Sequence, residues 1–432
     1  MITYRYEWVD IMKIKVKEMP YSEVISLKRP AHKKPPKPSQ SLKRLIKVLS
    51  DSNLKGAALT VSDEVKALGK DEPILYLMNH SSFVDLMIAS KMIWPKDYHI
   101  VCTSDGFVGK EGLMRRIGCL PTRKFVMDVS LVKDIVYVMK KLGDSVLMYP
   151  EASYSFDGTA TPLPKELGKL VKMLGVNVVM IKTCGAFLHD PLYNCLQTRK
   201  VDISANATLL FDKGSLKESS IEEINAKLKE AFNVDYFKEQ QENRVCVSEP
   251  FRADGLNRVL YKCPHCGSES DMEGAGINIT CKKCGTSYEL TEYGFLDCIT
   301  GEGRFRHIPD WYKWERECVR SEIEEGRYNL DIPVDIIMMV DYSAVYRVGE
   351  GRLQHDLNGF SLTGCNGELS YSQSTKASYS LYADYYWYEL GDVICIGNTD
   401  CLYYCFPKCD MDVVAKTRLA AEEMYKLNGC AT

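Results

Sequence analysis

Apolar runs of strand length alternate with helical patterns through residues 60–215, and this rhythm constrains the fold more than any other feature of the chain. The strand-like runs are Ile74–Met78, His99–Thr103, Ser145–Tyr149 and Val176–Lys182. Between them lie segments such as Ser130–Leu142, whose apolar residues recur at helical spacing. Strands that alternate with helices form units in which neighbouring strands run parallel. We therefore expect a mostly parallel α/β sheet in a domain of residues 60–255.

Two Cys-x-x-Cys pairs follow in residues 256–292. Their members are Cys263, Cys266, Cys281 and Cys284. This spacing is typical of a closed tetrahedral shell around a structural zinc ion, and the glycine after each pair permits a tight turn. Iron is chemically possible in such a shell, and a pair of redox dithiols is the alternative. We expect a zinc ribbon with a structural or docking role, since residues 261–290 mix lysines with acidic residues and offer no basic face for nucleic acid.

The composition changes again beyond a predicted helical connector, residues 293–330, which holds a helix around Trp311–Glu325. The expected last domain, residues 331–432, is rich in tyrosine, valine and isoleucine, which favour strands. Turn signals divide it at Gly349–Gly351, Asn358–Gly359 and Asn366–Gly367. The pattern predicts an antiparallel β domain closed by one amphipathic helix over Asp412–Asn428, an order that looks like a pleckstrin-homology-type fold.

Residues 1–59 form a basic N-terminal arm, although the net charge of the chain is only −3. The first 60 residues hold 13 Lys/Arg against 5 Asp/Glu, and such an arm implies an anionic partner. The proline-rich stretch Leu27–Ser41 predicts an extended, solvated linker that packs little. The basic amphipathic helix expected after it would lie on an anionic membrane or dock on the protein's own core. Its apolar positions are Leu42, Leu45, Ile46 and Leu49.

Membrane-spanning and exported classes of protein do not fit this sequence. No stretch approaches the ~18 consecutive apolar residues that a bilayer span needs, and charges interrupt the first twenty residues, where a signal peptide needs an apolar run. We therefore expect a cytoplasmic protein that is peripheral on the inner face of a membrane.

The motif with the clearest chemical meaning is Asn79-His80-Ser81-Ser82-Phe83-Val84-Asp85, directly after the apolar run Ile74–Met78. His80 and Asp85 meet if the histidine lies in the turn and the aspartate in the first helical turn, with Ser81 or Ser82 as the N-cap. A neutral imidazole held by a carboxylate can take a proton from an alcohol. The alternative is a capping box, in which Asp85 only satisfies backbone donors.

This motif resembles the Asn-His-x-Ser-x-x-Asp block of the lysophospholipid and 1-acyl-glycerol-3-phosphate acyltransferase family, and all four of its fixed positions agree. The family's third block is similar to Tyr149–Ser155, and its second block, which ends in arginine, is similar to Gly118–Lys124. The resemblance covers roughly residues 60–215 and implies a glycerolipid acyltransferase-like α/β domain. The substrate-binding residues that it implies are Asn79, Ser82, Arg123, Lys124, Glu151 and Ser155.

By this resemblance the protein is an O-acyltransferase in which His80 is the general base and Asp85 orients it. Acyl-CoA or acyl carrier protein would supply the acyl group to a glycerolipid hydroxyl such as that of 1-acyl-glycerol-3-phosphate. Backbone donors after Ser81 would stabilise the oxyanion. Tyr154 stands where the family has an arginine, so phosphate recognition would depend on other cations. The available cations are Arg123, Lys124, Lys165 and Lys169.

Two other functions stay open: a catalytically inactive lipid-binding or scaffold protein, and a thioesterase. The missing arginine and the long accessory region favour the scaffold, whereas the ordered blocks favour the enzyme. The expected partners are an acyl thioester donor, a lysophospholipid or other alcohol, a membrane surface and, through the C-terminal domain, a protein. The aromatic stretch Tyr379–Tyr388 is either a partner or lipid surface or the packing of a β core.

Overall fold

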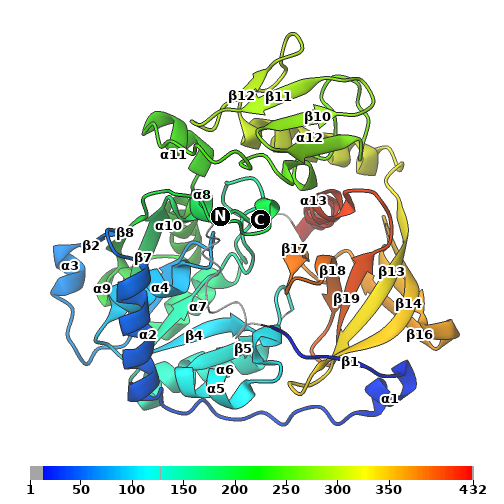
Figure 1. Ribbon diagram of the computed structural model, residues 1–432. Coiled ribbons are helices and arrows are strands. Elements are labelled where there is room, and N and C mark those ends of the chain that lie inside the picture. Colours follow the sequence, from blue (N-terminus) through cyan, green and yellow to red (C-terminus); the bar gives the residue numbers. More distant parts are fainter. Residues whose placement is uncertain (1–12, 127, 431–432) are drawn as a thin grey trace.

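The computed structural model describes residues 13–126 and 128–430 (Figure 1). Within them the chain forms three sheets, of seven, four and eight strands. Part of the expected basic arm, residues 1–12, lies outside the described residues. No helix within the described ranges combines the length and the apolar character that crossing a bilayer requires.

The seven-stranded sheet corresponds to the predicted α/β domain. Its strands are β2 (Ala58–Val61), β3 (Ile74–Met78), β4 (Tyr98–Thr103), β5 (Cys119–Thr122), β6 (Ser145–Met148), β7 (Asn177–Cys184) and β8 (Ser204–Phe211). Their order is β2-β8-β7-β3-β6-β4-β5, and every neighbouring pair is parallel except β7 and β8. All of β3 is buried, as expected for a strand covered on both faces. The prediction of a mostly parallel sheet is confirmed.

Helices cover both faces of this sheet. The helices in this part of the chain are α2 (Gln40–Asn53), α3 (Asp63–Lys66), α4 (Asp85–Ile93), α5 (Glu111–Ile117), α6 (Val129–Tyr137), α7 (Leu167–Leu174), α8 (Ala186–His189), α9 (Lys213–Glu218), α10 (Ile221–Phe232) and α11 (Tyr236–Glu242). Ile88 of α4 packs on one face, with α2 against α4, while Ile135 of α6, Val171 of α7 and Leu228 of α10 pack on the other. The helix predicted at 130–142 is α6, which continues as a π-helical turn.

The eight-stranded sheet lies in the C-terminal part of the chain and is closed by α13 (Val413–Tyr425). Its strands are β13 (Leu330–Met339), β14 (Val345–Asp356), β15 (Gly359–Gly364), β16 (Leu369–Ser374), β17 (Tyr382–Trp387), β18 (Gly391–Gly397), β19 (Leu402–Pro407) and β1 (Val16–Glu18). The order β16-β15-β14-β13-β19-β18-β17 is antiparallel throughout. An antiparallel sheet with one closing helix is therefore found, as predicted.

Two of the three predicted turns in this sheet are found. Asn358–Gly359 connects β14 to β15, and Asn366–Gly367 lies between β15 and β16. The turn predicted at Gly349–Gly351 is wrong, because these residues lie inside β14 and pair with β13. Gly349 has a φ of +134° beside a register shift after Ile336, and such a bulge explains a glycine in the interior of a strand.

The N-terminal segment connects the two large sheets. β1 pairs in parallel with β14, α1 (Tyr21–Ser26) follows, and the chain then runs back to α2 (Figure 1). This return segment is extended, as predicted. It nevertheless packs, since Pro35 and Pro38 are buried and the N–H of Ser39 donates to a carbonyl of α5 (2.8 Å). Proline rings bury apolar surface without leaving an N–H unpaired. Most other residues of the linker are exposed, as predicted, so it packs at these few points only.

The four-stranded sheet, with the cysteine pairs, lies in the sequence between the seven-stranded sheet and the main strands of the eight-stranded sheet. Its strands are β9 (Met272–Ala275), β10 (Asn278–Cys281), β11 (Ser287–Leu290) and β12 (Leu296–Cys298). α12 (Ile308–Glu324) packs on it through Trp311, whose ring centroid is 5.1 Å from that of Tyr288. The helix starts before the predicted Trp311 because Pro309 suits a first helical turn.

Candidate active site

His80 lies in the turn between β3 and α4, and Asp85 is the first residue of α4. The imidazole Nδ1 is 3.0 Å from Asp85 Oδ2. Asp85 is buried, whereas 19% of the His80 side chain remains exposed. An imidazole whose Nδ1–H is held by a carboxylate presents its Nε2 as a proton acceptor. The turn thus brings the two residues together in the geometry that a general base requires.

Asp85 also holds the turn itself. Its Oδ2 accepts hydrogen bonds from the backbone N–H of Ser81 (2.9 Å) and of Ser82 (3.1 Å), so the carboxylate makes both kinds of contact that the sequence left as alternatives. The residue before α4 is Val84, so the prediction of Ser81 or Ser82 as N-cap is wrong. The Val84 N–H donates to Ser82 Oγ (3.1 Å). These three amides already have acceptors, so they do not supply the predicted oxyanion donors.

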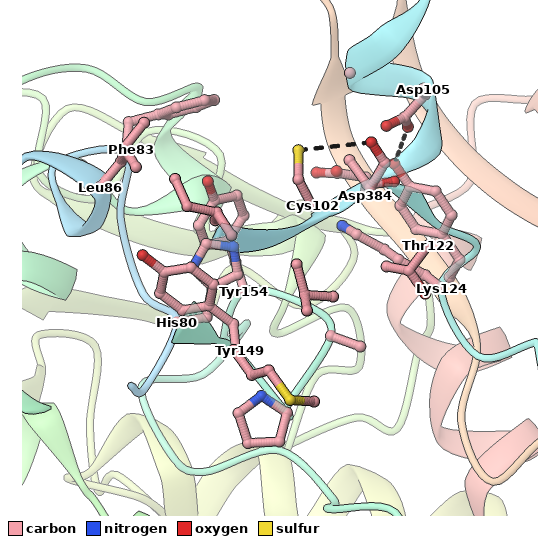
Figure 2. Close-up of a pocket in the computed structure, with 18 of the residues that line it drawn as sticks. His80, Phe83, Leu86, Cys102, Asp105, Thr122, Lys124, Tyr149, Tyr154 and Asp384 are labelled. Carbon is pink, nitrogen blue, oxygen red and sulfur yellow. Dashed lines mark hydrogen bonds between the residues drawn. The ribbon is translucent and has the colours of Figure 1, made fainter. Parts of the chain in front are cut away.

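Two tyrosine rings pack against the imidazole. The ring centroids of Tyr149 and Tyr154 lie 4.3 and 4.1 Å from that of His80 (Figure 2). The resulting burial lowers the pKa of His80, while Asp85 opposes the shift and Lys124 adds to it. The imidazole is therefore neutral at neutral pH, which is the form that a general base needs. Tyr154 stands at the position of the family's arginine. Its ring contacts the histidine, whereas the guanidinium of an arginine would add a positive charge.

Glu151, from the loop after β6, is bound to the same turn. Its Oε2 accepts the backbone N–H of His80 (2.9 Å), and its Oε1 accepts the N–H of Thr161 (2.9 Å). Burial raises the pKa of Glu151 to about 7, with the two amides acting in the opposite direction. Ser155 is occupied within its own loop, where its Oγ donates to the carbonyl of Thr159 (2.7 Å). Both residues shape the loop, and substrate contact by either stays a prediction.

The remaining residues of the first block differ in their surroundings. Asn79 is fully buried, and its side chain bonds to Thr183 of β7 (2.8 Å) and to the Tyr236 hydroxyl of α11. Ser82 Oγ donates to Asp190, which follows α8. Asn79 therefore fixes the end of β3 against its neighbours, whereas Ser82 borders the open space beside the histidine.

The two cations of the second block both line the cavity beside the histidine. Lys124 Nζ lies over the Tyr382 ring, 4.3 Å from its centroid, and its charge acts on His80. Burial raises the pKa of Tyr342 and of Tyr404, and in both cases the charge of Arg123 opposes the shift. Arg123 lines the cavity as well, and its Nε is buried without a hydrogen-bond partner among the described residues. Of the two residues that the sequence left open, Lys124 is the one whose charge reaches the histidine.

A cavity of about 1630 Å³ contains the exposed edge of His80. Most of its lining is apolar, beginning with Leu49 of α2 and Leu86 of α4. The predicted site residues that line it are His80, Ser82, Arg123, Lys124, Lys165 and Lys169. Asp85, Asn79, Glu151 and Ser155 lie behind this lining and contact protein groups. The space is large and apolar enough for a lipid chain.

The C-terminal sheet supplies one wall of this cavity, which the sequence analysis missed. Tyr382, Asp384 and Tyr385 of β17 line it together with His80. The Tyr382 hydroxyl (2.6 Å) and Trp387 Nε1 (3.2 Å) both donate to Oδ2 of Asp105, in the 3₁₀ turn after β4. The aromatic stretch at 379–388 therefore packs in a β core and also borders the site. Its aromatic density was the only feature of the sequence that could have indicated this wall.

The four cysteines of the predicted zinc site lie together. All four Sγ atoms are within 4.8 Å of one another, with Cys263–Cys284 at 3.7 Å and Cys266–Cys281 at 3.8 Å. Four sulfurs at the zinc–thiolate bond length would be about 3.8 Å apart in a tetrahedron. The glycines that follow the pairs, Gly267 and Gly285, have φ values of +72° and +74°, as a tight knuckle requires. The arrangement fits a tetrahedral metal ion such as zinc.

Comparison with known proteins finds a matching family model and similar solved structures. Residues 59–182 match the family model described as Acyltransferase, a span that includes both members of the His80–Asp85 pair. Among solved structures, the chain is similar to the 1-acyl-sn-glycerophosphate (LPA) acyltransferase PlsC from Thermotoga maritima, at 14% identity, over 44% of this chain and 78% of that one, with a TM-score of 0.33. No curated protein matches the chain.

Proposed function

From the premise that residues 59–182 are an acyltransferase-family domain, we propose that this protein transfers a fatty acyl group from acyl-CoA or acyl carrier protein to a glycerolipid hydroxyl. The family's acceptor, 1-acyl-glycerol-3-phosphate, is the reference compound. The observation that carries the proposal is the 3.0 Å contact between His80 Nδ1 and Asp85 Oδ2 at the edge of a large apolar cavity.

In the proposed reaction, His80 Nε2 takes the proton of the acceptor hydroxyl as the oxygen attacks the thioester carbonyl. Asp85 keeps the imidazole in the tautomer that can do this and stabilises the imidazolium that forms. When the tetrahedral intermediate collapses, the carbon–sulfur bond breaks and the thiol leaves with the proton from His80. Glu151 acts as a positioning residue, because it holds the backbone of His80 rather than lining the cavity.

Detection of the acylated product tests this proposal. Purified protein is incubated with long-chain acyl-CoA or acyl carrier protein and a panel of lysolipids, and new diacyl lipid is measured by mass spectrometry. Product that requires both substrates supports acyl transfer. Free fatty acid without an acceptor would identify a thioesterase, and no turnover with any pair would favour the lipid-binding or scaffold function.

A peripheral membrane location, on the cytoplasmic side, is part of the proposal. Leu45 and Val48 of α2 are 52% and 63% exposed, and Phe83 and Leu86, at the start of α4, are 38% and 40% exposed. Phe83 and Leu86 also line the cavity. With the basic residues of α2, these side chains support contact with an anionic membrane from which a lipid substrate enters.

The two accessory parts complete the proposal. Zinc on the four cysteines would close a four-sulfur shell and stabilise the ribbon, with no position left for chemistry. In the C-terminal part, a first antiparallel run (β13 to β16), a second (β17 to β19) and a closing helix support a pleckstrin-homology-type domain. A protein that binds the C-terminal domain would have to do so without displacing β17, which forms a wall of the cavity.

A further inference from the structure

The loop after β6, residues 149–157, forms much of the surroundings of His80. Glu151 accepts the backbone N–H of His80, and the ring centroid of Tyr154 lies 4.1 Å from that of the imidazole. Between these two residues, Ala152 has a φ of +56°. A residue other than glycine keeps such a left-handed conformation only where neighbouring contacts hold it. The contacts that hold this loop therefore also bear on the geometry at His80.

A buried arginine of the C-terminal helix supplies such contacts. Arg418 belongs to α13 and is 3% exposed. Its Nη1 donates to Ser153 Oγ (3.2 Å) and to the backbone carbonyl of Tyr154 (3.5 Å). Its guanidinium also lies over the ring of Phe156, 4.4 Å from the centroid. One side chain from a distant part of the chain thus contacts three residues of the loop.

Arg418 is itself fixed on the side away from the loop. Its Nε donates to Oε1 of Glu422, one turn further along α13 (3.2 Å). Ser380 Oγ donates to the same oxygen (2.7 Å), and Arg316 of α12 pairs with the other carboxylate oxygen at 2.7 Å. Burial acts to raise the pKa of Glu422, but Arg316 and Arg418 lower it to about 2. The carboxylate is therefore charged at neutral pH and anchors the guanidinium.

The effect of Arg418 on the site is indirect. Tyr154 lines the cavity together with His80, whereas Arg418, Ser153 and Phe156 lie behind that lining. A guanidinium in this place does not touch a substrate in the cavity. It acts on the histidine through Tyr154, whose backbone it binds and whose ring packs on the imidazole.

We propose that Arg418 is a positioning residue for the His80 site, because it fixes Ser153 and Tyr154 and thereby keeps the imidazole enclosed by the Tyr154 ring. This inference rests on the proposed acyl transfer and adds α13 to the parts of the chain that the reaction requires. A misplacement of about 1 Å at a reacting group can lower a rate by about 10²-fold. The C-terminal helix thus completes a site whose proposed base lies within residues 59–182.

The test follows the titration of His80 by NMR in protein with isotope-labelled histidine, where the His80 signal is the one that is lost in His80→Ala. Two variants act on the two sides of the contact. Arg418→Lys keeps the charge but has only one nitrogen to serve both Glu422 and the loop, and Ser153→Ala removes the hydroxyl acceptor on the loop.

Burial lowers the pKa of His80 in the wild type. If the Tyr154 ring is released, the imidazole meets more water, so its pKa should rise toward 6.5 in both variants. The other groups at the histidine are the same in all of these proteins, namely Asp85, Lys124, Tyr149 and Glu151. The kcat of acyl transfer should fall by about tenfold or more in both variants.

The matched control is Arg316→Lys, which changes the other arginine on Glu422, a residue whose ion pairs go to Glu422 and Glu423. It should leave the pKa of His80 unchanged. An unchanged pKa in Arg418→Lys and Ser153→Ala, or an equal rise in Arg316→Lys, would overturn the inference, and Ser153→Ala alone decides if Arg418→Lys does not fold. Absence of acyl transfer by the wild type would remove the proposed function, while the titration would still decide the role of Arg418.

Discussion

Asp85 Oδ2 lies 3.0 Å from Nδ1 of His80, and the same oxygen accepts hydrogen bonds from the backbone N–H groups of Ser81 and Ser82. One buried carboxylate therefore fixes both the backbone of the turn and the orientation of the histidine. Glu151 adds a second constraint by accepting the N–H of His80 itself. The proposed base is held by its own turn and by the loop after β6, so the first and third blocks meet at His80.

Replacing Asp85 with asparagine should abolish most activity without removing the fold. The asparagine oxygen would replace Oδ2, because two backbone N–H groups donate to that position. The contact to Nδ1 would remain, but the charge that stabilises the imidazolium would be lost, so kcat should fall by about 10²-fold or more. The measurement is steady-state kinetics, with circular dichroism to verify folding. Near wild-type kcat in Asp85→Asn would show that the carboxylate serves only the turn.

The pH dependence should reflect the buried histidine. Its pKa is lowered from 6.5, so kcat/KM should stay high as the pH falls through 6.5 and decline only below it. The unfolded state binds the proton more readily, so the stability contribution of neutral His80 is present above pH 6.5 and is lost as the pH falls below that value. Because the pKa of Glu151 is about 7, the decline must persist in Glu151→Gln. A decline centred at pH 6.5 or above in that variant would argue against His80 as the base.

Metal content should follow the four cysteines. Elemental analysis of the purified protein should find about one zinc per chain, and Cys263→Ser or Cys281→Ser should lose it because a four-thiolate shell cannot close with three. Cys246→Ser, which changes an exposed cysteine outside the cluster, is the control and should retain the metal. Equal metal content in all of these proteins would rule out the site.

The contact between Asp105 and β17 should matter for both stability and activity. Asp105→Ala removes the acceptor of the Tyr382 hydroxyl and of Trp387 Nε1, and unpaired buried donors of this kind cost about 1–3 kcal/mol. Denaturant unfolding should show this loss, and kcat/KM should fall because β17 forms a wall of the cavity. A variant that is destabilised yet fully active would show that this wall is not part of the working site.

Local patterns account for what the sequence could predict. The burial of β3, the alternation around it, the His80–Asp85 spacing and the paired cysteines depend on residues close together in the chain. Contacts between distant segments were not accessible in this way. The wall formed by β17, the contact of Lys124 with the Tyr382 ring and the packing of Pro38 join segments that are far apart in the chain. Gly349 was misread because a glycine in a bulge and a glycine in a turn look alike in sequence.

The most direct test of the central claim is acceptor-dependent release of free thiol from long-chain acyl-CoA by wild-type protein and His80→Ala. The account predicts release by the wild type that requires a lysolipid or monoacylglycerol acceptor and falls by at least about 10²-fold in His80→Ala, since general-base catalysis typically contributes 10²–10⁴-fold. Equal acceptor-dependent release by the two proteins would contradict His80 as the base on which the mechanism depends.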